Sequence, residues 1–141
     1  MNQKPIKQTT SEISHWSGIF ITRTIGAWAI VSALLITIGG AERWTSHAYD
    51  ELNLMPGSPF TWAAIIGAAG LCIIIGSITQ LHIGRFSLRN FGLWVTALWC
   101  FILVIGFVAA TLIPGVSYNI STTYFLVGVL SIFATKTRFT P

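Results

Sequence analysis

Residues 60–81 form an uncharged, strongly apolar stretch of 22 residues. A helix of that length is ~33 Å long, which matches the ~30 Å hydrocarbon core of a bilayer. Ser58 is placed to cap such a helix, and Pro59 suits its first position, where a missing N–H is harmless. We therefore predict a membrane-spanning helix here.

The composition extends this prediction to the whole chain. Of the 141 residues, 53% are hydrophobic and only 9% are charged, whereas soluble domains carry about 25% charged residues. This number of charged residues is too small to cover a water-exposed surface. The sequence therefore predicts an integral membrane protein. The length suffices for one bundle and leaves no room for a separate soluble domain.

The predicted fold is all-α: a bundle of four transmembrane helices with a short outer amphipathic helix. The transmembrane domain covers residues 18–135, and its four spans lie at about 18–41, 60–81, 91–113 and 116–135. The short segment 136–141 forms a tail.

Residues 1–17 are predicted to form a polar cytoplasmic segment, of which about the first ten residues are expected to be disordered. Ile13, Trp16 and Ile19 then recur at helical spacing. Two interpretations stay open, a short interfacial helix that runs into the first span and a flexible tail.

The loop 42–59 carries the predicted outer helix, at about residues 43–54. Its apolar residues are spaced four, four and three apart, which places them in one stripe that faces lipid or the bundle: Trp44, Ala48, Leu52 and Met55.

The basic residues predict the orientation. With the N-terminus inside, the inner side holds seven of them and the outer side holds only Arg43: Lys4, Lys7, Arg23, Arg85, Arg89, Lys136 and Arg138 are inside. This asymmetry predicts a protein of the inner (plasma) membrane with both termini in the cytoplasm. The predicted interfacial anchors lie near span ends: Trp16, Arg23, Trp44, Trp62 and Trp94.

Small residues recur at a spacing of four along the predicted spans. Because helices in lipid associate mainly by close packing, such rows indicate helix contact faces. The predicted helix-packing residues are Ala63, Gly67, Ala68, Cys72, Gly76, Gly92, Thr96 and Cys100. Ala29 and Ala33 form a similar row on the first span. Contacts within one chain and self-association into oligomers are both open, and the first is favoured.

The two cysteines lead to a more specific prediction. Cys72 and Cys100 lie at similar depth on consecutive spans, in the rows Ala68-Cys72-Gly76 and Gly92-Thr96-Cys100. Because consecutive spans with a short connection are usually antiparallel neighbours, we expect these rows to face each other.

The sequence offers no pattern that is typical of a catalytic, cofactor or metal site. The central turns of the spans contain no Asp, Glu, Lys, Arg or His, which argues against pumps and proton-coupled transporters. His47, Asp50 and Glu51 are too few for a metal site and are interpreted as a solvated face. Because the basic residues are explained by topology, we expect no nucleic-acid partner.

Several short motifs occur together: Arg43-Trp44, Tyr49, Met55-Pro56-Gly57, Thr61-Trp62, Gly76-Ser77, Gly92-Leu93-Trp94 and Leu98-Trp99-Cys100. Over residues 18–135 this pattern resembles small four-span membrane proteins of actinobacterial bacteriophages. The resemblance implies a holin-like role for some members and carries over no functional residue.

Three hypotheses about function follow. The first is a non-enzymatic phage or bacterial protein that lies in the lipid bilayer and self-assembles into a homo-oligomer. The alternative is an accessory subunit that binds an unidentified membrane protein partner. A small transporter or membrane enzyme is disfavoured by the uncharged spans.

The predicted topology can be tested with reporter fusions. A reporter fused after Pro141 should give a cytoplasmic signal, and one inserted near Asn53 a periplasmic signal, because the basic residues gather on one side. A periplasmic signal at Pro141 would contradict the four-span scheme.

Overall fold

The computed structural model describes residues 6–39, 57–83, 86–110 and 119–136. Four helices dominate them: α1 (Ile6–Gly39), α3 (Phe60–Thr79), α4 (Leu88–Ala110) and α5 (Asn119–Lys136). Two strands of two residues each, β1 (His82–Ile83) and β2 (Phe86–Ser87), join α3 to α4. The predicted outer helix at 43–54 lies outside the described residues.

The all-α membrane fold is confirmed. Three helical segments are long and apolar enough to cross a membrane: Ser17–Gly39, Phe60–Thr79 and Leu88–Gly106. The fourth apolar segment, Thr122–Lys136 within α5, is shorter. At 1.5 Å per residue its 15 residues cover ~22 Å, less than the ~30 Å hydrocarbon core.

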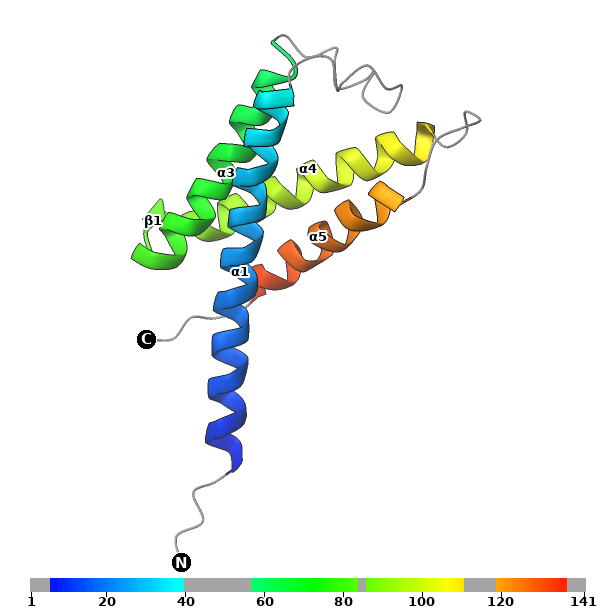
Figure 1. The fold of residues 1–141 in the computed structure, drawn as a ribbon. Helices are drawn as coiled ribbons and strands as arrows, with labels where there is room; N and C mark the ends of the chain where they lie inside the picture. The colour runs from blue at the N-terminus through cyan, green and yellow to red at the C-terminus, as the bar shows by residue number, and fades with distance from the viewer. Residues whose placement is uncertain (1–5, 40–56, 84–85, 111–118, 137–141) are drawn as a thin grey trace, which may run out of the picture.

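Helix α1 begins earlier than expected. It starts at Ile6 and continues without a break into the first span (Figure 1). The expectation of disorder through about residue ten is therefore wrong from Ile6 onward, and so is the flexible tail. No Pro or Gly occurs between Ile6 and Ser17, so the segment contains no strong helix breaker that would stop extension of the helix from the span.

The start of α3 differs from the prediction by one residue. Its N-cap is Pro59, one residue after the predicted cap at Ser58. A backbone bond precedes the helix: the N–H of Thr61 donates to the Gly57 carbonyl over 3.1 Å. Gly57 has a φ of 77°, a conformation that glycine adopts at little cost.

The short connection expected between α3 and α4 contains a two-stranded antiparallel hairpin. Gln80 ends α3 in the left-handed region, and β1 then pairs antiparallel with β2. The N–H of Leu88 donates to the carbonyl of Leu81 over 2.9 Å, which closes the hairpin. As a result α4 begins at Leu88, three residues before the predicted start of its span.

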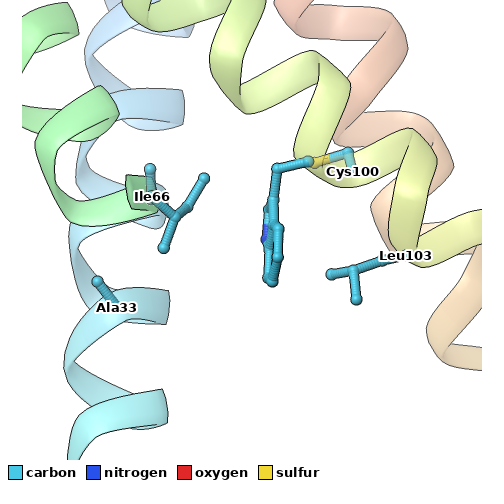
Figure 2. Close-up of a cluster of buried hydrophobic side chains, with 6 residues drawn as sticks. Ala33, Ile66, Cys100 and Leu103 are labelled. Carbon is cyan, nitrogen blue, oxygen red and sulfur yellow. The ribbon is translucent and has the colours of Figure 1, made fainter. Parts of the chain in front are cut away.

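The helices pack as two pairs that share the α3–α4 contact. Helix α1 lies along α3, and α5 lies along α4 (Figure 1). One apolar cluster joins α1, α3 and α4, and Figure 2 shows Ala33, Ile66 and Leu103 pointing towards the same space. A second cluster of Ile25, Ile73, Leu93 and Ala134 brings α5 into the core.

Glycines permit the closest helix contacts. A Cβ at Gly70 would lie 2.8 Å from the Gly26 carbonyl oxygen on α1, and a Cβ at Gly92 would lie 2.5 Å from the Ala69 carbonyl oxygen on α3. Because these neighbours are backbone atoms, a side chain at either position would force the helices apart.

Replacing Gly92 by Ala should therefore destabilise the bundle, by ~1–3 kcal/mol if overpacking costs what it does in soluble cores. Gly128→Ala is the matched control, because its Cβ would meet the Cys100 side chain at 3.2 Å and its three nearest neighbours are all side-chain atoms. Unfolding in detergent followed by circular dichroism measures both. Equal stability of the two variants would contradict the α3–α4 contact.

Candidate functional site

A polar pocket lies where α3 ends and α4 begins. It has a volume of about 190 Å³ and is lined by Gly76, Gln80, His82, Ser87, Arg89 and Asn90. These residues come from the end of α3, both strands of the hairpin and the first turn of α4. The hairpin brings them together, because β1 pairs His82 directly with Ser87.

The pocket contains a buried charge. Arg89 is only 7% exposed, and among the residues whose burial the structure describes it is the one buried charged side chain. Its Nε and Nη2 donate hydrogen bonds to Oδ1 of Asn90 over 3.1 and 3.0 Å. The paired bonds fix the plane of the guanidinium group.

Gly76 brings the start of α4 against α3. A Cβ at Gly76 would lie 2.8 Å from the Cα of Arg89 and would also collide with its backbone nitrogen. Only a residue without a side chain allows this approach, so Gly76 forms one wall of the pocket.

The lining residues have the chemistry of hydrogen-bond donors. Arg89 is cationic, and Gln80, Ser87, Asn90 and His82 can each donate. No acidic side chain is among the described residues that line the pocket. The arrangement therefore suits an anionic group.

A second hollow, of about 180 Å³, lies between α1 and α5 and is apolar. It is lined by Phe20, Ile21, Thr24, Ile25, Trp28, Val127 and Leu130. Both helices expose large apolar side chains, among them Phe20 on α1 and Leu126 on α5.

The predicted helix-packing residues fall into three groups. Buried are Ala63, Gly76, Gly92, Thr96 and Cys100; half-buried are Gly67 and Cys72; exposed is Ala68. Gly67 lies against the α1 row, since its Cβ would be 3.1 Å from that of Ala33.

The predicted pairing of the two cysteine rows is wrong in detail. Ala68 is exposed, and the α3 residues that meet Gly92 are Ala69 and Ile73. Further along α4, Cys100 contacts α5, because a Cβ at Gly128 would lie 3.2 Å from its Cβ. The α4 row therefore faces α3 at one end and α5 further along. The spacing of the small residues identified them as packing candidates, but it did not predict that the face of α3 with Ala69 and Ile73 contacts Gly92.

The predicted interfacial anchors have different surroundings. Arg23 is exposed and Trp94 is 55% exposed, as anchors are. Trp62 is half-buried, and its ring centroid lies 4.8 Å from that of Trp99 on α4. Trp16 belongs to α1, and Trp44 lies outside the described residues.

Sequence analysis missed the polar pocket because it treated Arg89 only as a loop charge that sets the topology. A usable signal was present. Polar residues stand at both ends of a short connection, Gln80 and His82 before it and Arg89 and Asn90 after it. Two antiparallel helices joined by so short a link must bring these ends together.

Comparison with known proteins adds no relative: no family model, curated protein or solved structure matches this chain.

The two kinds of tryptophan environment lead to a stability prediction. Trp99 is 3% exposed, so Trp99→Ala should leave a cavity and cost ~3–5 kcal/mol, as in soluble cores. Trp94→Ala removes an exposed ring from the same helix and should cost less than ~1 kcal/mol. Unfolding in detergent micelles checks both. A larger loss at Trp94 would mean that α4 is rotated from the orientation described.

Proposed function

We propose that this chain is a non-enzymatic, multi-pass protein of the bacterial inner membrane, phage-encoded or bacterial, whose copies assemble with one another in the bilayer. Both termini face the cytoplasm in this proposal, as the basic residues predict. Holin-like permeabilisation of the membrane is its most specific form, and it rests on the resemblance to phage membrane proteins.

The observation that carries the proposal is that most residues of the membrane-spanning segments are not buried by other parts of the same chain. Only 22% of the apolar span in α1 is buried, against 33% in α3 and 44% in α4. Large apolar side chains such as Leu34, Leu71 and Leu98 are more than half exposed. Lipid can cover this surface, and so can a second copy of the chain.

One face permits a close approach between copies. Ala64 and Ala68 are both exposed and lie four residues apart on α3. Helices in lipid approach most closely where small residues stand at this spacing, because their association depends on close packing. A cysteine introduced on this face can therefore test self-assembly by cross-linking.

In a background of Cys72→Ala and Cys100→Ala, the variant Ala68→Cys should form disulfide-linked homodimers in native membranes under mild oxidation. Leu98→Cys is the matched control, because Leu98 is 62% exposed on α4 near the middle of its span. It should stay monomeric. Failure of Ala68→Cys to cross-link would contradict assembly through α3. A cross-link to a single different protein would instead support the accessory-subunit alternative.

The holin-like form makes a separate prediction. Induced expression of the wild-type chain should depolarise the membrane abruptly, as seen with a potential-sensitive dye. Ala68→Leu should abolish this effect without lowering the amount of protein, because Ala68 is exposed and a larger side chain there blocks close approach of copies. Normal potential with the wild-type chain would contradict a holin-like role.

A further inference from the structure

We propose that the apolar groove between α1 and α5 holds one acyl chain of a phospholipid, and that Arg23 beside the groove favours a lipid with an anionic headgroup. The lipid belongs to the leaflet in which the span of α1 begins. This inference does not depend on self-assembly, because it concerns a surface of one chain. It rests on the lining, depth and width of the groove and on the charge at its edge.

The first argument is the lining of the groove. Its described residues include no charged side chain. Ile25 is buried at 4% exposure, Trp28 and Leu130 are half-buried, and Phe20 is 73% exposed. The lining therefore extends from the core to the outer surface of the bundle, where lipid chains can reach it from the side.

The groove is open because α5 is inclined relative to α1 (Figure 1). Helices that cross at an angle touch over a short length and diverge beside the contact. The rings of Trp28 and Tyr124 form such a contact, with their centroids 5.8 Å apart in an edge-on arrangement. From Trp28 the lining continues along α1 towards its N-terminal end as far as Phe20.

The second argument is depth. Trp28 is the middle residue of the membrane-spanning segment Ser17–Gly39, so it lies near the midplane of the bilayer. The stretch from Phe20 to Trp28 covers ~12 Å of helix, and half of the hydrocarbon core is ~15 Å thick. The acyl chains of one leaflet also end near the midplane. A chain beside α1 therefore matches the groove in both depth and length.

The third argument is width. A volume of about 180 Å³ spread over ~12 Å of helix gives a channel ~4 Å across. Carbon atoms in contact are ~4 Å apart, so this is the thickness of one hydrocarbon chain. A helix with its side chains is ~10 Å in diameter and cannot enter. The width therefore favours an acyl chain over a helix of a second copy.

The charge at the edge of the groove indicates the headgroup. Arg23 is exposed and stands three residues after Phe20, so the two side chains are neighbours on the surface of α1. Side chains of a helix lean towards its N-terminus, and a long Arg side chain extends to the headgroups. Its guanidinium group can bind a phosphate through two parallel hydrogen bonds. One lipid can thus place its chain in the groove and its phosphate at Arg23.

The test uses the full chain in phosphatidylcholine vesicles that contain a small fraction of phosphatidylglycerol with a photoactivatable diazirine on one acyl chain. After illumination, mass spectrometry of peptides locates the labelled residues. Leu130 should be labelled more than Leu126, which is 57% exposed on the same helix but outside the described lining. Equal labelling of these two leucines would mean that lipid covers α5 uniformly and would overturn the proposal. An unlabelled groove would also overturn it, and dimers in native mass spectrometry would then identify a second copy as the occupant.

A variant that fills the groove tests the position of the acyl chain. Thr24 lines the groove and is exposed, so Thr24→Phe adds a ring there without disturbing the core. It should reduce the labelling of Leu130 to the level found at Leu126. Thr122→Phe is the matched control, because Thr122 is exposed on α5 outside the described lining, and it should leave the labelling unchanged. Full labelling of Leu130 in a folded Thr24→Phe variant would contradict a chain in the groove.

The headgroup preference is tested by comparing phosphatidylglycerol and phosphatidylcholine that carry the same photoactivatable chain. In the wild-type protein the anionic lipid should label Leu130 more strongly. Arg23→Met should lower this preference about fivefold, which is the typical effect of one basic residue near an anionic surface. Arg23→Lys keeps the charge and should keep most of the preference. An unchanged preference in Arg23→Met, or an equal loss in both variants, would overturn the role of the Arg23 charge.

Discussion

The close contact between α3 and α4 organises the structure. Lipid tails are as apolar as the side chains themselves, so moving an apolar side chain from lipid into a helix interface gives no hydrophobic free energy. Close packing must therefore supply the attraction between helices. Gly92 lets α4 approach the backbone of α3 at Ala69, and Gly76 lets α3 approach the backbone of α4 at Arg89. Two glycines on opposite helices thus fix both the separation and the register of this pair.

This contact positions the other parts of the molecule. Helix α1 packs on α3 through Gly70 and the row of Ala29 and Ala33, and α5 packs on α4 beside Cys100. The same approach of α3 and α4 brings the residues that line the polar pocket together at their junction. The packing of small residues and the gathering of polar donors therefore have one cause.

Sequence alone was sufficient for the features that depend on length and composition. An uncharged run such as 60–81 has few alternatives to a span, and Gly76 and Gly92, two of the small residues at contact spacing, are buried. It failed where the rotation of a helix decides the outcome. Ala68 and Ala69 are adjacent and chemically identical, yet Ala68 is exposed and Ala69 is 3% exposed. The burial of Arg89 was equally hidden, because it depends on the close approach of Gly76 to the start of α4.

The central claim is that α3 and α4 meet at Gly92 when the protein is in a bilayer. Magic-angle-spinning NMR of the ¹³C-labelled protein in lipid tests it through the cross peak between Gly92 Cα and the side chain of Ile73. A Cβ at Gly92 would lie 2.8 Å from Cγ1 of Ile73, so a strong short-range cross peak is predicted. Its absence, with both residues assigned and their signals intense, would contradict the contact and the pocket that depends on it.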